Sequence, residues 1–157
     1  MLVYRICKSK YARDLSGKGA ALYGGRWNPP GTPLLYTAGS ISLACLEYLA
    51  NNFHILSSQN ICLVKIKLQD TSSVEECELQ SLDQNWNQKN YIPHSTQSIG
   101  ERFVREANSY VLKVPSAIVP QEYNFLLNPI HFHHQHTQVE EVIEPFILDE
   151  RLFGKHD

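Results

Sequence analysis

Three polar side chains in the first third of the chain could act together on a charged substrate. Arg26 follows a Gly-Gly pair and precedes the sequence Trp-Asn-Pro-Pro-Gly, while Tyr36 and Glu47 come further along. Glycine permits positive φ angles, and proline fixes φ and removes a backbone donor, so the backbone around Arg26 is expected to be irregular. A loop of this kind can hold one side chain out toward a ligand.

The chemistry that fits these residue types is recognition of a dinucleotide. A guanidinium is always charged, and its rigid fork suits a phosphate group. A carboxylate in the same cleft could stabilise positive charge that develops on a sugar ring. Pyrophosphate and ribose in one ligand indicate a dinucleotide such as NAD. A structural role stays open for Arg26, because an arginine on a glycine-rich loop can simply hold down a turn.

Glu47 is expected on a helix. Ser40 is a suitable N-cap residue for a helix that runs to about Phe53. The apolar residues of this segment follow the spacing of one helical face: Leu43, Leu46, Ala50 and Phe53. Glu47 would lie near the edge of this face, where a carboxylate beside buried apolar side chains needs a partner.

The other segments predict short strands and few helices. Residues 61–68 alternate between apolar and lysine side chains over much of their length, which is the clearest strand pattern in the chain. Residues 11–25 read as a polar connection. Further strands are expected at residues 2–6, 34–37, 110–115, 117–119 and 142–148, and helices at residues 74–82 and 98–108. Because these elements do not alternate regularly, they favour an α+β fold, in one domain over residues 1–157.

Composition limits the classes of function. The net charge is −2 and no segment collects many Lys or Arg residues, so direct binding of nucleic acid is not expected. The first residues lack the basic and apolar regions of a signal peptide, and no apolar run approaches the roughly 20 residues that span a bilayer. A cytoplasmic location without membrane contact is expected.

A native metal site is not expected. The stretch from His131 to His136 could bring imidazoles together, but no cysteine or second histidine cluster has the spacing of a closed zinc site. This stretch is interpreted as a solvated loop. The four cysteines contain no C-x-x-C pair and are expected to be buried thiols: Cys7, Cys45, Cys62 and Cys77. The glycines between residues 17 and 25 fit neither a dinucleotide-binding fingerprint nor a P-loop.

Short motifs spread over nearly the whole chain resemble those of the RES domain family, found as toxins of bacterial toxin–antitoxin pairs. In order, the motifs are Tyr4-Arg5-Ile6, Gly24-Gly25-Arg26-Trp27-Asn28-Pro29, Leu35-Tyr36-Thr37-Ala38, Ala44-Cys45-Leu46-Glu47, Ser95-Thr96-Gln97, Val114-Pro115-Ser116-Ala117, Glu122-Tyr123-Asn124-Phe125-Leu126-Leu127-Asn128-Pro129 and Asp149-Glu150-Arg151-Leu152-Phe153.

The resemblance implies an ADP-ribosyltransferase-like α+β fold with short, mostly antiparallel strands. It also implies the toxin of a type II toxin–antitoxin pair, restrained by a helix-turn-helix antitoxin of the Xre type. Such a toxin would use NAD as its substrate, with no further cofactor, and would break the bond between nicotinamide and ribose.

Roles for the site residues follow as a hypothesis. Glu47 would hydrogen-bond a ribose hydroxyl and stabilise an oxocarbenium-like sugar, with Tyr36 at the nicotinamide end. Arg26 and Arg5 would hold the phosphates or ribose. Ser116 would add a hydroxyl bond to the substrate. The catalytic set is thus Arg26, Tyr36 and Glu47, and the substrate-binding set is Arg5 and Ser116.

Two alternatives stay open. The acceptor of ADP-ribose could be water, phosphate or a protein side chain, and the last choice would make the chain an ADP-ribosyltransferase that modifies a cellular protein. A non-catalytic binding module is the other alternative. The presence together of Arg26, Tyr36, Glu47 and Ser116 argues against it, because a purely structural role does not need all four.

Overall fold

The structure is a computed structural model, and it describes residues 1–52, 60–69 and 73–153. Seven strands form one sheet in the order β4-β5-β6-β2-β1-β3-β7. The β4–β5 pair is parallel and the other described pairs are antiparallel. The strands are β1 (Leu2–Lys8), β2 (Leu35–Ala38), β3 (Ile61–Lys67), β4 (Val74–Glu76), β5 (Val111–Pro115), β6 (Tyr123–Leu127) and β7 (Gln138–Ile143).

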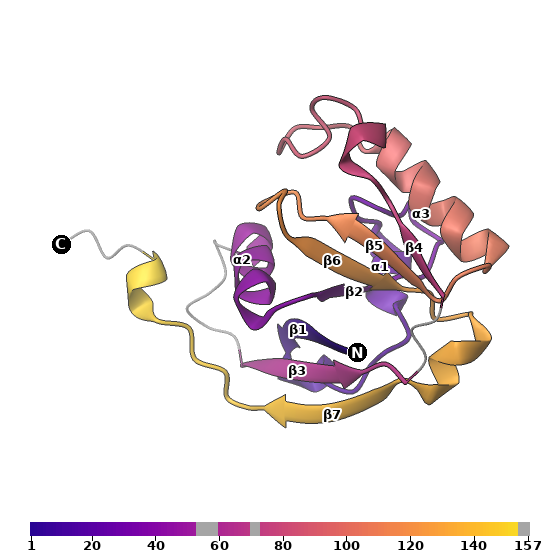
Figure 1. Ribbon diagram of the computed structural model, residues 1–157. Coiled ribbons are helices and arrows are strands. Elements are labelled where there is room, and N and C mark those ends of the chain that lie inside the picture. The colour runs from indigo at the N-terminus through magenta and orange to yellow at the C-terminus, as the bar shows by residue number, and fades with distance from the viewer. Residues whose placement is uncertain (53–59, 70–72, 154–157) are drawn as a thin grey trace.

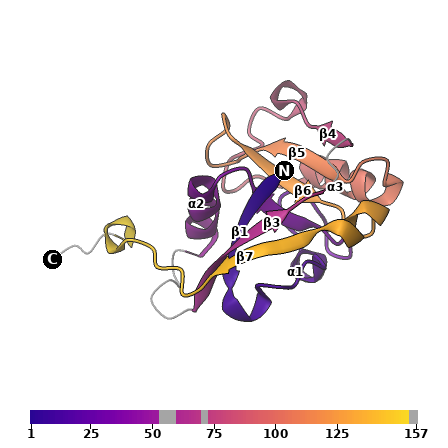
Figure 2. The same cartoon turned by 60° about the horizontal axis from the view of Figure 1, so that its bottom comes forward.

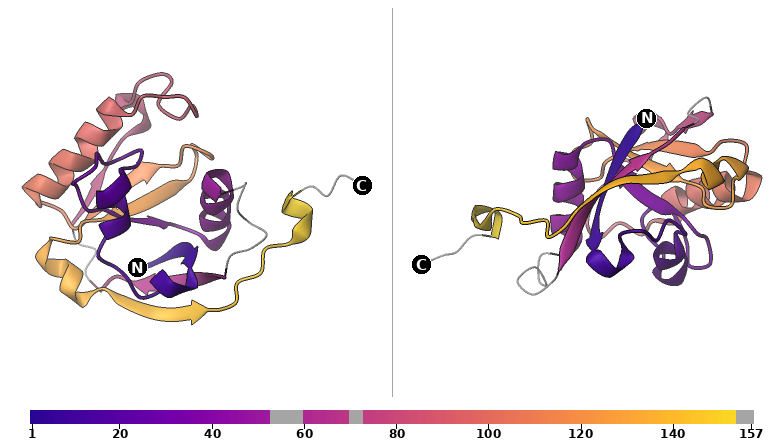
Figure 3. Two further views of the ribbon diagram at one scale, coloured as in Figure 1. Left: turned by 180° about the vertical axis from the view of Figure 1, so that it is seen from behind. Right: turned by 90° about the horizontal axis from the view of Figure 1, so that it is seen from below.

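Helices lie at two places along this sheet. In Figure 1, α2 (Ile41–Asn52) lies beside β1 and β2, whereas α3 (His94–Glu106) lies over the β4–β5 end. The short helix α1 (Lys18–Tyr23) precedes the Gly-Gly pair. Single 3-10 turns complete the described chain: η1 (Ser9–Tyr11), η3 (Leu79–Ser81), η4 (Phe132–His136) and η5 (Glu150–Phe153). Phe146 and Leu148, after β7, still pack against the core, whereas Figures 2 and 3 show η5 set apart from the body.

The β1–β3 ladder is the longest continuous pairing described in the sheet. It pairs without interruption from Leu2 opposite Lys67 to Lys8 opposite Ile61. The predicted alternation of β3 is confirmed in its second half, where Lys67 is exposed, but all residues from Ile61 to Val64 are buried. Both faces of the first half of β3 are therefore covered, because Cys62 and Val64 belong to one core cluster and Ile61 and Leu63 to another.

Helix α2 begins as the sequence predicts but faces the sheet differently. The Ser40 hydroxyl accepts a hydrogen bond from the Leu43 amide at 3.1 Å, which confirms the N-cap. Leu43 and Ala44 are buried, whereas Leu46 is 39 % exposed. The buried stripe therefore continues through Glu47, one turn after Leu43. Phe53 lies outside the described residues.

Several predicted boundaries are wrong because pairing between distant residues decides them. Residues 74–82 contain β4 and η3 rather than a helix, since β4 gains its hydrogen bonds from β5. Residues 117–119 form a bend between β5 and β6, closed by the Glu122 amide on the Val119 carbonyl at 2.8 Å, rather than a strand. Strand β6 and helix α1 were not predicted, α3 starts four residues early, and β7 ends before most of the predicted 142–148 strand.

The histidine stretch packs against the body more closely than predicted. His131 is buried, and its ring lies 5.6 Å from the Tyr110 ring. His134 Nδ1 lies 3.0 Å from the Tyr110 hydroxyl. The interpretation of a solvated loop is therefore wrong for His131, whereas Phe132, Gln135 and His136 are exposed. Within the described residues, His, Cys, Asp and Glu side chains form no group of three or more that could hold a metal ion.

The cysteines and the length of the helices can be compared with the sequence predictions. Cys7, Cys62 and Cys77 are buried free thiols, as predicted, and Cys45 is partly buried. No described helix is both long enough and apolar enough to cross a membrane.

Gly100 allows α3 to pack closely against the loop of residues 24–29, here called the Arg26 loop. Its replacement tests this packing. A Cβ atom at Gly100 would overlap the carbonyl oxygen of Trp27, which is backbone and cannot swing aside. We expect Gly100→Ala to lower the free energy of unfolding by roughly 3 kcal/mol, although alanine is the better helix former. Urea denaturation measures the change.

Gly19→Ala is the matched control for this change. Gly19 lies in α1 with no atom within 4 Å of an added Cβ. We expect Gly19→Ala to raise the free energy of unfolding by about 0.5–1 kcal/mol, as an ordinary glycine-to-alanine change in a helix does. Equal effects of the two changes would show that α3 does not press on Trp27.

Candidate functional site

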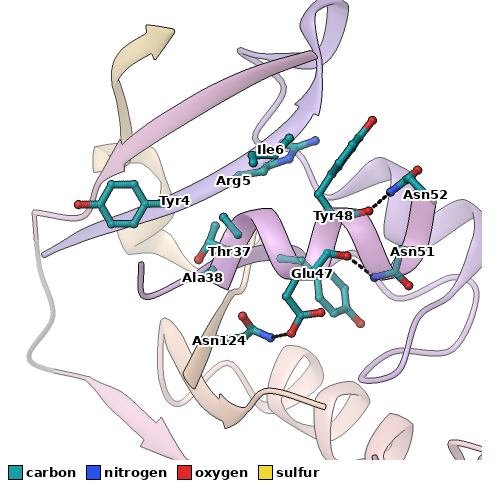
Figure 4. Close-up of a pocket in the computed structure, with 12 residues that line it drawn as sticks. Tyr4, Arg5, Ile6, Thr37, Ala38, Glu47, Tyr48, Asn51, Asn52 and Asn124 are labelled. Carbon is teal, nitrogen blue, oxygen red and sulfur yellow. Dashed lines mark hydrogen bonds between the residues drawn. The ribbon is translucent and has the colours of Figure 1, made fainter. Parts of the chain in front are cut away.

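A pocket of about 230 Å³ opens between α2 and the sheet (Figure 4). Drug-sized ligands usually occupy about 300–1,000 Å³, so this pocket has room for one part of a dinucleotide rather than the whole. The lining comes from β1, β2, α2 and β6: Tyr4, Arg5, Ile6, Tyr36, Thr37, Ala38, Ala44, Glu47, Tyr48, Asn51, Asn52 and Asn124.

Glu47 is held at the pocket by hydrogen bonds to one of its two carboxylate oxygens. Oε1 accepts from the Ser116 hydroxyl at 2.8 Å and from the Asn124 side-chain amide (Figure 4 shows the second). Ser116 directly follows β5, and Asn124 lies in β6, so the two donors come from neighbouring strands. Oε2 accepts no hydrogen bond from the residues that the structure describes, and it is free for a ligand.

Ser116 lies behind Glu47 rather than on the pocket wall. Its side chain is fully buried, and its oxygen accepts hydrogen bonds from the amides of Ile118 and Val119, both at 3.1 Å. Its single hydrogen is donated to Glu47. In this arrangement the Ser116 hydroxyl supports Glu47, and the predicted direct bond to substrate would need the hydroxyl to give up this contact.

Tyr36 joins the pocket to the Arg26 loop. Its hydroxyl donates to Asn28 Oδ1 at 2.7 Å and accepts from the Trp27 amide at 3.0 Å. Burial raises the pKa of the Tyr36 hydroxyl above its ordinary value, so it stays protonated and acts as a donor. Gly25 permits this contact, because a Cβ there would lie 2.6 Å from the Tyr36 hydroxyl oxygen.

Arg26 is turned toward the segment before α3. Its guanidinium donates to the backbone carbonyls of Trp86 and Gln88, the second at 3.3 Å, and lies 5.9 Å from the centre of the Tyr91 ring. Burial lowers the pKa of Arg26, and the negative charge of Glu47 opposes this shift. The guanidinium stays charged, because arginine does not lose its proton in proteins.

The structure brings together part of the predicted site. Arg5, Tyr36 and Glu47 line the pocket, and Arg5 also donates to the Asp14 carbonyl at 2.7 Å. Ser116 supports Glu47 from behind. Arg26 is not among the lining residues, although its charge interacts with that of Glu47.

Sequence reasoning missed two asparagines. Asn124 donates to Glu47, and Asn28 anchors the Tyr36 hydroxyl. Asn28 is fully buried, and its amide donates to the carbonyls of Ala20, Pro29 and Thr32. Both asparagines lie within the motifs that carry the family resemblance. Those motifs could have indicated a role for them, but residue type alone did not suggest one.

The fold and the site define an α+β protein with a carboxylate-bearing pocket at the end of a mostly antiparallel sheet. The family model of the RES domain matches residues 2–149. The chain therefore belongs to the RES domain family.

Relatives of known name cover nearly all of the chain. The protein named "Toxin Res" of Photorhabdus laumondii is 36 % identical over 156 residues, which is 97 % of each chain. The "Prs ADP-ribosylating toxin" of a Sphingobium species is 35 % identical over 151 residues, which is 92 % of this chain and 89 % of that protein.

A solved structure shows the same fold. The crystal structure of the M. tuberculosis MbcT–MbcA toxin–antitoxin complex matches with a TM-score of 0.76 at 20 % identity, over 97 % of this chain and 86 % of that one. At this identity the match concerns the fold alone. The ADP-ribosyltransferase-like α+β fold, with its short and mostly antiparallel strands, is confirmed.

The Tyr36 hydroxyl has a structural role that a single substitution tests. In Tyr36→Phe the buried Asn28 oxygen and the Trp27 amide lose their shared partner. We expect the free energy of unfolding to fall by about 1–3 kcal/mol in urea denaturation, the usual effect of leaving buried polar groups unpaired. Tyr23→Phe is the control, since Tyr23 is 84 % exposed. Equal stability of the two variants would contradict the anchoring role.

Proposed function

We propose that this chain is the toxin of a toxin–antitoxin pair and that it cleaves NAD at the bond between nicotinamide and ribose. The observation that carries the proposal is the state of Glu47. Its Oε1 is held by Ser116 and Asn124, and its Oε2 is left for a ligand in the pocket. Family membership and the toxin names of the relatives support the toxin role.

The proposed cleavage of NAD requires a negative charge close to the ribose. When the bond between nicotinamide and ribose breaks, its electron pair leaves with the ring nitrogen, and neutral nicotinamide departs. The ribose is left with oxocarbenium character. A carboxylate that is already fixed in place stabilises this charge without reorganising during the reaction. Glu47 Oε2 would accept a hydrogen bond from a ribose hydroxyl and supply this charge.

Partial exclusion of water strengthens the effect. Two unit charges 4 Å apart gain about 1 kcal/mol in bulk water and about 4 kcal/mol at an effective dielectric constant near 20. The pocket walls include the side chains of Ile6, Ala38 and Tyr36, which would limit the access of water around a bound ligand. Arg5 at the same pocket, and Arg26 once its guanidinium is released from the Trp86 and Gln88 carbonyls, would bind the phosphates.

Transfer of ADP-ribose to a protein is the second candidate. The observation that favours it is the name of the Sphingobium relative, an ADP-ribosylating toxin that aligns with 92 % of this chain. Hydrolysis and transfer share the same first bond cleavage, so the pocket serves either. The two differ only in the acceptor.

The proposed partner is an antitoxin. The structural neighbour was solved as a toxin–antitoxin complex, and we infer an antitoxin of the Xre type for this chain from the family resemblance. In this proposal the protein acts in the cytoplasm, with NAD as substrate, no cofactor, and no direct contact with nucleic acid.

Nicotinamide release tests the reaction. Purified wild-type protein should release nicotinamide from NAD, and Glu47→Gln should lower kcat by about 100-fold or more, because it removes the charge but keeps the shape. The exposed change Glu101→Gln in α3 is the control and should retain wild-type rates. Full activity of folded Glu47→Gln would remove Glu47 from the chemistry.

Labelled NAD separates the two candidates. Free labelled ADP-ribose, or its phosphate ester when phosphate is present, would support cleavage with a small acceptor. Label on protein from a cell extract would support transfer instead. No release from the wild type with water, phosphate and extract each supplied would overturn both.

Arg26→Lys tests the use of the guanidinium fork. Lysine keeps the charge but cannot span the two carbonyls of Trp86 and Gln88 or bind a phosphate through two parallel bonds. We expect kcat/KM for NAD to fall by about 10-fold or more. Arg102→Lys, which alters an exposed ion pair with Glu75, is the control. Wild-type kinetics in Arg26→Lys would leave Arg26 as a structural residue only.

A further inference from the structure

Asn124 lies where a rigid strand meets the charged end of Glu47. Its backbone is paired on both sides, opposite Ala38 of β2 and opposite Val114 of β5. Its side chain enters the pocket and donates to Glu47 Oε1 (Figure 4). A donor mounted in the interior of a sheet can fix the position of its acceptor more tightly than one on a loop.

The two donors to Glu47 act on the same oxygen. Ser116 and Asn124 both bind Oε1, from positions on neighbouring strands. Two hydrogen bonds on one carboxylate oxygen restrict the position of that oxygen, and with it the rotation of the group, more than one bond would. Oε2 is then directed to one place, and Asn124 rather than Ser116 is the donor on the pocket side.

The other end of the Asn124 amide is unfavourable for stability. Its Oδ1 is buried and has no hydrogen-bond partner in the part of the chain that the structure describes. A buried carbonyl oxygen without a donor destabilises the folded state, and an apolar side chain at this position would avoid that loss. The benefit of an asparagine here therefore lies in its N–H group and in the acceptor of that group, Glu47.

We propose that Asn124 is a positioning residue for the cleavage of NAD, acting through Glu47. It holds Oε1 so that Oε2 meets the ribose as positive charge develops. This inference rests on the proposed function, since it concerns the same reaction. It assigns to Asn124 an effect on turnover without a matching effect on the stability of the fold.

Two substitutions test the N–H group. Asn124→Ala removes it, and Asn124→Asp keeps the shape but places a second carboxylate against Glu47. We expect kcat for nicotinamide release to fall by roughly 10-fold to 100-fold for Asn124→Ala and further for Asn124→Asp, because small misplacement of a reacting group has effects of this size. KM for NAD should change by less than about 3-fold. Asn108→Asp, the same change at an exposed asparagine, should keep wild-type kinetics.

Stability and a double-mutant cycle separate positioning from a general structural role. We expect the Tm of Asn124→Ala to stay within about 2 °C of the wild type, because loss of the bond to Glu47 is offset by removal of the unpaired oxygen. In the Glu47→Gln background, Asn124→Ala should lower kcat by less than about 2-fold, since its effect passes through the carboxylate. An undiminished loss of kcat in that background, or wild-type kcat in Asn124→Ala, would overturn the proposal.

A crystal structure of Asn124→Ala keeps this inference distinct from the proposed function. If the wild type releases no nicotinamide, the proposed function is wrong, and the kinetic test of Asn124 cannot support its role. Displacement of the Glu47 carboxylate from its contact with Ser116 in the variant would still support the positioning role. A Glu47 carboxylate in the wild-type position would refute it.

Discussion

The hydrogen bonds that join Glu47 to the sheet determine how the site is built. A partly buried carboxylate needs donors, and the described chain supplies them from the end of β5 and from β6, about 70 residues further along. Helix α2 must therefore present Glu47, and not its exposed Leu46, to the sheet. The pocket forms beside this junction, because β1 and β2 pass along the same side of α2.

A second set of long-range bonds fixes the loop that carries Arg26. Tyr36 holds one side of it through Trp27 and Asn28. Helix α3 holds the other side, where Thr96 donates to the Arg26 carbonyl and Gln97 donates to the Gly25 carbonyl at 2.9 Å. The loop is thus tied to β2 and to α3 at once. The irregular backbone that glycine and proline impose is useful here because these contacts select one conformation.

The sequence predicts correctly those features that depend on neighbouring residues. The N-cap at Ser40, the buried strand β3, and the pocket positions of Arg5, Tyr36 and Glu47 could all be proposed from residue type, spacing and family motif. Strand β4 could not, because three residues gain strand structure only by pairing with β5. The face of α2 and the place of Ser116 depend likewise on hydrogen bonds between residues far apart in sequence.

The arrangement also bears on the acceptor of ADP-ribose in the proposed reaction. The Ser116 oxygen accepts from two amides, and its only hydrogen is donated to Glu47. Burial keeps the Tyr36 hydroxyl protonated and raises the pKa of the Cys7 thiol in β1 to about 12, so neither is a ready nucleophile. Among these groups none is prepared to attack the sugar. In the proposed reaction, Glu47 would stabilise charge on the sugar, and an acceptor such as water, phosphate or a protein side chain would enter the pocket from outside.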